Sequence, residues 1–285
     1  MHRHSVRLAG IISAGGALLA LVTAGATIGG SPSAASVTNS KDAAIAAVRT
    51  ILAAPQTGVD AAKLTPVGDS DLTATGPVAG ALFSYYEVSG HDVWATVDVR
   101  DSHVAQLLLL SRSPATASAR ITGATAQTIA MSWLKDHGIS TDGLNVSVTA
   151  KDRGAAATYV VSLQRIVNGT QVPDSRLVEL DAGTGVVFLV NNIARPYVDP
   201  PAPKVDRDTA VSAARSAAGA ELGVAADSAA SAVESADLRV TFNSSNVQKL
   251  VWQIGISISK AGPPDYQYLV EVDALTGTAA ITGRG

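Results

Sequence analysis

The sequence predicts an α+β fold in which helices pack on antiparallel sheets. Three segments with helical periodicity start near positions 40, 125 and 208, and strand-like segments of alternating polarity follow each one. Two of the hairpins nearly repeat each other, RLVELDAGTGVVF at 176–188 and YLVEVDALTGTAA at 268–280. Strict alternation indicates a sheet with one wet face and one apolar face, which an apolar helix stripe can cover. We therefore expect tandem units, each a helix packed on a three- or four-stranded antiparallel sheet.

Residues 1–26 have the pattern of a secretory signal peptide. Two arginines precede an apolar run from Leu8 to Val22, and the small residues AGA follow at 24–26. The alternative is an uncleaved membrane anchor, because roughly 20 apolar residues can span a bilayer. Residues 27–39 are small and polar and predict a flexible lead-in. We expect the mature chain to be secreted or held in the cell envelope.

The composition fits an exported protein that folds without disulfides. The chain has 285 residues and no cysteine, so neither a disulfide nor a lipid-modified N-terminal cysteine is available. Its 24 acidic residues outnumber 21 basic ones, two of which lie in the signal. This negative balance favours neither nucleic acid nor an anionic membrane surface as partner.

The first unit, residues 40–111, is divergent. Ser40 is expected to cap the helix KDAAIAAVRTILAA, with Ile45, Val48 and Leu52 on one face. Its hairpin VWATVDVRDSHVAQLLLL lacks the Thr-Gly step and matches the others only with a one-residue deletion in the turn. The stretch APQTGVDAAKLTPVGDSDLTATGPVAG after the helix is expected to be a loop.

The second unit, residues 120–193, has a clearer pattern. Its helix ATAQTIAMSWLKDHG ends at Gly138. Alternation in its strands predicts that Val178 and Leu180 point inward. It predicts that Glu179 and Asp181 point out to solvent.

The third unit, residues 206–285, has the same order of elements. Its helix DTAVSAARSAAG is expected from Asp208 to Gly219. Alternation places a common set of residues on the apolar face of its strands: Trp252, Ile254, Ile256, Ile258, Tyr268, Val270 and Val272. The linkers are SRSPATASAR at 111–120 and a segment at 194–205. Four prolines in ARPYVDPPAP at 194–203 predict a stiff extended connector.

The twin DAxTG turns have a structural interpretation. The side chains of Asp181 and Asp273 can accept bonds from turn amides, and Gly185 and Gly277 can adopt the positive φ that closes such hairpins. Neither turn has the spacing of a calcium loop, so we expect no metal site and assign no cofactor.

The histidines outside the signal are His91, His103 and His137. None belongs to a metalloprotease-type zinc motif, and no serine lies in a nucleophile-elbow context. We expect surface histidines and assign no catalytic residue. The alternative is a cryptic hydrolase that uses His91 and His103 with the acids around Asp98.

Residues 159–187, YVVSLQRIVNGTQVPDSRLVELDAGTGVV, resemble PepSY-type domains, including those in propeptides of secreted thermolysin-like metalloproteases. The shared order is a strand ending in Arg, an Asn-Gly turn, a VP step, a second strand and an Asp-containing hairpin. Residues 250–279 resemble the same module, and the resemblance covers 120–285 better than 40–111. It implies a cystatin-like fold and an extracytoplasmic binding role, such as peptidase inhibition or chaperoning.

No protease domain follows the last hairpin, so we expect action in trans on a separate secreted protein. The leading hypothesis is a non-enzymatic binding protein that inhibits or regulates a secreted peptidase. A second hypothesis is a structural spacer of the envelope, suggested by the proline-rich linker.

The candidate binding residues lie in the turn RIVNGTQVPDSR. Arg165, Asn168 and Arg176 gather around a short exposed loop, where arginines can fork onto the carboxylates of a partner. In the alternative interpretation these arginines only solubilise the surface, and the Asn-Gly pair only makes the turn. Outward strand positions, a solvated face, are Gln164, Glu179, Gln253, Ser257 and Glu271.

Overall fold

A computed structural model describes nine stretches of the chain. They are residues 40–53, 72–78, 85–90, 93–109, 119–152, 157–223, 231–243, 247–258 and 266–284. The expected signal peptide and lead-in lie outside these residues. Within these stretches, no helix combines the length and apolar character needed to cross a membrane.

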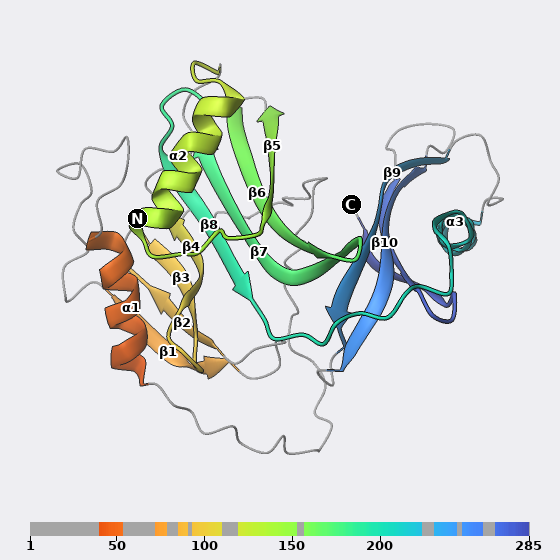
Figure 1. Cartoon of the computed structure of the whole chain (residues 1–285), viewed down its shortest axis with the longest axis horizontal. Coiled ribbons are helices and arrows are strands. Elements are labelled where there is room, and N and C mark those ends of the chain that lie inside the picture. The colour runs from red at the N-terminus through yellow and green to blue at the C-terminus, as the bar shows by residue number, and fades with distance from the viewer. Residues whose placement is uncertain are drawn as a thin grey trace, which may run out of the picture.

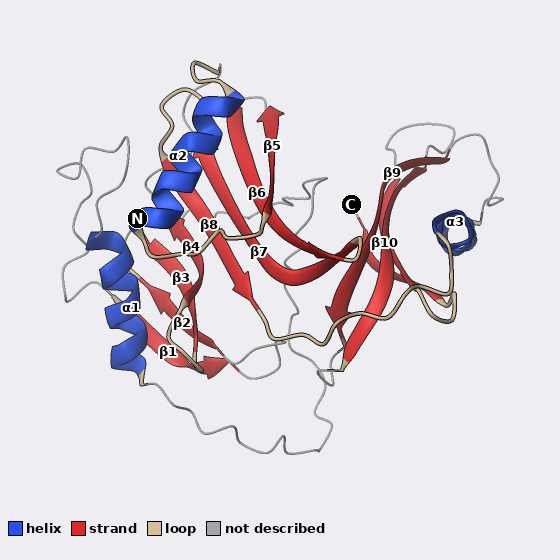
Figure 2. Cartoon of the chain, in the orientation of Figure 1, coloured by secondary structure: helices blue, strands red, loops and turns tan. Residues whose placement is uncertain are grey.

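The described residues form a mixed α+β fold with three helices and one large sheet (Figures 1 and 2). The helices are α1 (Lys41–Ala53), α2 (Gly123–Asp136) and α3 (Arg207–Leu222). The first strands are β1 (Thr73–Val78), β2 (Tyr85–Ser89), β3 (Val93–Asp98) and β4 (Val104–Leu109). The next are β5 (Asn145–Asp152), β6 (Ala157–Val167), β7 (Thr170–Asp181) and β8 (Val187–Ala194). The last are β9 (Ser231–Phe242), β10 (Gln248–Ile258), β11 (Tyr266–Asp273) and β12 (Ala279–Arg284).

Local capping residues set the helix ends. The Ser40 hydroxyl accepts the amide of Ala43 at 3.2 Å, as expected, and the Asp206 carboxylate accepts the amide of Thr209 at 2.8 Å. The third helix is longer than predicted, because Gly219 is buried inside it and the left-handed Gly223, at φ 66°, ends it. Propensity alone placed the stop too early, at a glycine that lies buried within the helix.

Strands β1 to β8 form a continuous antiparallel run in the order β1-β2-β3-β4-β8-β7-β6-β5. The junction is short and joins β4 to β8, with Leu107 opposite Val190. Helices α1 and α2 lie on the same face of this run (Figure 1) and share one core, in which Val48, Trp133 and Leu163 are fully buried. We expected separate sheets, but the edges of the first two strand groups pair with each other.

Strands β9 to β12 form a four-stranded antiparallel meander under α3. The helix contributes three fully buried alanines, Ala210, Ala214 and Ala218, whose small side chains let it lie close to the strands. The predicted apolar face is confirmed, since Ile254, Ile256, Ile258, Tyr268, Val270 and Val272 are buried there and Trp252 packs against them. The distal ends of β6 and β7 curve toward β9 (Figure 1), and Gln171 pairs in parallel with Arg239.

Two strand expectations are wrong. The segment after α1 was expected to be all loop, but Thr73–Val78 is β1, which pairs with β2. Glu179 and Asp181 were expected to face solvent, but only 5% and 3% of their surfaces are exposed. The Thr158 hydroxyl donates to Glu179 Oε1 at 3.0 Å, and turn amides donate to Asp181. Hydrogen bonding permits this burial, which strand alternation cannot reveal.

Candidate functional site

The β6–β7 hairpin carries the residues that the sequence nominated. Asn168 and Gly169 form its two-residue turn, with φ values of 50° and 77°, and Val167 pairs with Thr170 across it. Positive φ at both central positions is the type I′ geometry that Asn-Gly favours, because it matches the twist of the flanking strands. The backbone of the turn therefore accounts for Asn168.

Arg165 is engaged within the chain. Its Nε donates to Asp174 Oδ2 at 2.5 Å, and its Nη2 donates to the carbonyl oxygen of Asp142 at 2.9 Å. The bond that Arg165 donates to the Asp174 carboxylate raises the pKa of the guanidinium above its ordinary value. Arg165 thus ties β6 to β7 and to the loop that follows α2.

Arg176 does not lie at the loop tip, contrary to expectation. It lies within β7, opposite Leu163 on β6 and Asn192 on β8, and only 9% of it is exposed. Its Nη1 donates to Asp174 Oδ1 at 2.8 Å and to the carbonyl of Ile193 at 2.9 Å. The sequence analysis placed Arg176 at the loop because it follows the Asn-Gly turn closely in the chain, but strand β7 begins at Thr170 and Arg176 lies in its middle.

Asp174 is the residue that the sequence reasoning missed. Its two carboxylate oxygens receive the two arginines, one each, so it joins the nominated pair into a single internal network. Its position two residues before Arg176, on the same face of the strand, was the available signal. The exposed residues at this end of the hairpin are Ile166, Asn168 and Gly169, and 45% of Ile166 is exposed.

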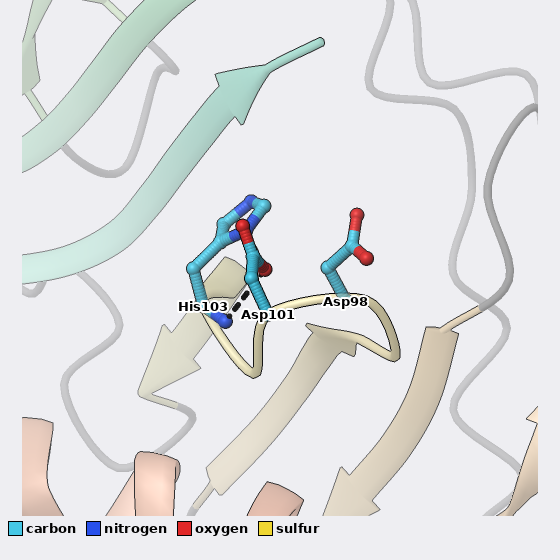
Figure 3. Close-up of side chains that lie close together, drawn as sticks. All are labelled: Asp98, Asp101 and His103. Carbon is cyan, nitrogen blue, oxygen red and sulfur yellow. Dashed lines mark hydrogen bonds and ion pairs between the residues drawn. The ribbon is translucent and has the colours of Figure 1, made fainter. Parts of the chain in front are cut away.

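A second cluster lies in the β3–β4 turn (Figure 3) and consists of Asp98, Asp101 and His103. One ligand atom of each residue lies within 4.8 Å of the others. His103 Nδ1 lies 2.6 Å from Asp101 Oδ1. Asp98 is buried, and Arg100 bonds both oxygens of its carboxylate. The Arg100 backbone amide donates to Oδ1 at 2.8 Å, and Arg100 Nη2 donates to Oδ2 at 2.6 Å.

The electrostatics of Asp98 follow from these bonds. Burial alone would raise its pKa, but the side chain and backbone bonds from Arg100 outweigh burial and leave the pKa below its ordinary value. A cation at this carboxylate would have to displace the arginine.

The backbone of this turn is the same in all three places where it occurs. In the first, the Asp98 amide donates to the carbonyl of His103 at 2.9 Å and Ser102 donates to Asp98 at 2.9 Å. The corresponding bonds join Asp181 with Val186 and Gly185, and Asp273 with Thr278 and Gly277. Ser102 has φ 59°, and the two glycines have 77° and 80°.

The side-chain bonds also repeat. The aspartate accepts the amide two residues on, from Arg100, Gly183 and Leu275 in the three turns. A second side chain, three positions after the aspartate, accepts the backbone amide of the residue two positions after itself. This side chain belongs to Asp101, Thr184 and Thr276 in the three turns. The first turn therefore needs no one-residue deletion, contrary to expectation, and Asp98 and Asp101 hold a hairpin.

The histidines of the hydrolase hypothesis are only partly placed. His91 and Asp92 lie outside the described residues. His137 was expected to be a surface histidine, but it is half-buried and stacks on Trp133 with 3.7 Å between ring centroids. Its Nδ1 lies 2.6 Å from the Trp133 carbonyl and its Nε2 lies 2.9 Å from the Ile51 carbonyl, so it links the ends of α2 and α1. Burial lowers its pKa, although both carbonyls oppose the shift.

Arg195, at the start of the proline-rich connector, was also missed. It is 7% exposed, and its guanidinium carbon lies 3.2 Å from the ring centroid of Phe242 at the end of β9. Burial, followed by the nearby Arg100, lowers its pKa to about 10. The connector is extended and attached: the Val198 amide donates to Gln248 Oε1 at 2.8 Å, and Gln248 Nε2 returns a bond at 2.7 Å.

Comparison with known proteins gives a likeness in structure and none in sequence. No family model matches the chain, and no curated protein matches it. Among solved structures, it is similar to the Bacillus megaterium YpeB C-terminal domain, with 14% sequence identity and a TM-score of 0.42. The alignment covers 86% of this chain and 98% of that one.

Proposed function

We propose that this chain is a non-enzymatic, extracytoplasmic binding protein made of three PepSY-like units, and that it regulates a secreted peptidase in trans. Each proposed unit is one helix with four strands: α1 with β1–β4, α2 with β5–β8, and α3 with β9–β12. The signal-like N-terminus motivates the location, and the motifs at 159–187 and 250–279 motivate the PepSY-like assignment.

The observation that carries the proposal is the thrice-repeated hairpin turn. It supports three copies of one unit, because backbone and side-chain bonds recur at the same offsets from Asp98, Asp181 and Asp273. It also gives the most reactive-looking cluster in the described part of the chain a structural role. The positions of Asp98 and Asp101 hold the hairpin in all three described turns, so a catalytic role is not needed to explain these two residues.

The two alternatives have less support. A spacer would keep its units apart, yet the connector bonds to β10 through Val198 and Gln248. In the hydrolase alternative, the contact between His103 Nδ1 and Asp101 leaves Nε2 available, but Asp101 also accepts the His103 amide, a bond that recurs at the same offsets in the other two turns and so has a structural explanation.

The test is a dose–response experiment with the purified mature chain, residues 27–285, added to the secreted fraction of the source cells. We expect saturable inhibition or activation of peptidase activity and recovery of the affected peptidase on the immobilised chain. Trp133→Asp, which places a charge in the core, serves as the unfolded control and should have no effect. Unchanged peptidase activity together with no recovered peptidase would overturn the proposal.

A further inference from the structure

Strand β5 has a regular outer edge on which no strand of the described residues pairs. All eight of its residues pair with β6 without a register shift, from Asn145 opposite Gln164 to Asp152 opposite Ala157. No other described strand pairs with β5. Its residues from Asn145 to Ala150 are exposed except for the half-buried Val148, and Val146 is 37% exposed. The outer edge therefore presents backbone donors and acceptors to solvent.

The equivalent strands of the other two groups, β1 and β9, are less suited to adding a strand. Strand β1 has a register irregularity between Ala74 and Pro77, and proline offers no backbone donor. Strand β9 is met on its outer side by β7, where Gln171 pairs in parallel with Arg239 and Arg239 Nη2 donates to Gln171 Oε1 at 2.8 Å. The molecule thus already adds a strand at this position once, beside β9, and of the two equivalent strands without one, β1 and β5, only β5 is regular.

We propose that β5 binds an extended segment of the partner polypeptide as an added strand. The inference rests on the proposed function and names the surface that performs it. Proteins usually protect free edges with proline, bulges or charged side chains, particularly lysine. Strand β5 has no proline and no bulge, and its charges, Lys151 and Asp152, stand at its far end, which leaves the stretch from Asn145 to Ala150 uncharged. An added strand would satisfy its outward backbone groups, which gives affinity that depends little on sequence.

The side chains of β5 define the segment it fits. Val146 and Val148 face the same side as α2, where Val148 borders the first turn at Gly123, and Ala150 follows on that face. Asn145, Ser147 and Thr149 occupy the opposite face. The bound segment should alternate in the same way, with apolar residues beside Val146 and Val148 and small polar residues on the other side.

The chain offers a matched pair of edge variants. Ala150 on β5 and Ala280 on β12 are both exposed alanines on edge strands. A lysine on an edge strand opposes strand addition, so Ala150→Lys should close the β5 edge while Ala280→Lys leaves it open. Val146→Lys is the second β5 variant.

The probe is a random dodecapeptide phage library selected on the mature chain. We expect enrichment of alternating peptides whose affinity falls at least tenfold with Ala150→Lys and with Val146→Lys, and is unchanged with Ala280→Lys. Bound peptide should slow amide exchange at 145–152. Recovery of no peptide, equal binding by all variants, or protection elsewhere would overturn the proposal. So would a dimer of the chain alone that Ala150→Lys dissociates, because a second copy would then occupy the edge.

The two proposals fail separately. If the chain alters a secreted peptidase but Ala150→Lys retains that effect, the strand-addition proposal fails and the regulatory function stands. If peptides bind β5 but no peptidase responds, the edge is a binding site and the regulatory function fails.

Discussion

The β3–β4 turn and the β7–β8 turn have the same backbone and almost no shared side chains. Each turn consists of six residues and begins at an aspartate, Asp98 or Asp181. The same pair of backbone hydrogen bonds closes both turns. The β7–β8 turn uses Gly185 at its left-handed position, whereas the β3–β4 turn uses Ser102. The comparison teaches that the aspartate and the closing bonds define this hairpin, and that the Thr-Gly step is only its least strained solution.

The largest expected effect comes from Gly185→Ala. A Cβ at this position would lie 2.7 Å from Ile129 Cδ1 and would sit on a backbone with φ 77°. Left-handed strain and overpacking against the core add up to about 3 kcal/mol of lost stability. Urea unfolding of the mature chain measures this loss. A loss below about 1 kcal/mol would show that the turn tolerates a side chain as Ser102 does.

Asp98→Asn should cost less, about 2 kcal/mol, because it replaces a buried carboxylate that receives charged bonds from Arg100. The loss should depend on pH. The lowered pKa of Asp98 means that its stabilisation is present above its ordinary value of 3.8 and disappears as pH falls through the lower folded value. Unfolding free energies of both proteins should therefore converge in acid, and a constant difference would contradict the account.

Gly277→Ala tests the same backbone without the clash. A Cβ there would meet Val205 Cγ2 at an ordinary 3.7 Å, so only the strain of φ 80° remains. We expect a loss of about 1 kcal/mol, clearly smaller than at Gly185. Equal losses at both glycines would mean that Ile129 moves aside without cost.

Ser102→Gly should have the smallest effect and the opposite sign. Ser102 already occupies the left-handed region at φ 59°, so glycine relieves strain there. A gain of about 0.5 kcal/mol in unfolding free energy is expected, partly offset by the greater freedom of glycine in the unfolded chain. Measurable destabilisation would show that the Ser102 side chain makes a needed contact.

The sequence predicted elements with strong periodicity and failed where tertiary pairing decides. The helix starts, the Asn-Gly turn and the apolar face of Ile254, Ile256 and Ile258 were predictable because each follows from local spacing. The joining of β4 to β8 was not, since an edge pair of three residues leaves no pattern in either strand. The equivalent turn at Asp98 was hidden because Ser102 stands where the other two turns have a glycine.

At the candidate site, too, local features were predictable from the sequence and contacts between strands were not. Arg165 and Asn168 were found at the hairpin, but the partner that engages both arginines, Asp174, lies across the strands from Arg165. Burial of Arg176 and Glu179 likewise depends on hydrogen-bond partners that spacing does not reveal.

Grafting the β7–β8 turn onto the β3–β4 turn tests the central claim most directly. The variant R100G/D101T/S102G/H103V removes the imidazole, Asp101 and Arg100 and installs the residues of the second turn at matching positions. The measurement is its effect on secreted peptidase activity beside that of the original chain. If the cluster is architecture and the chain acts by binding, the folded graft should give the same dose–response curve. A folded graft that loses the effect would contradict this account and make the cluster of Asp98, Asp101 and His103 the working site.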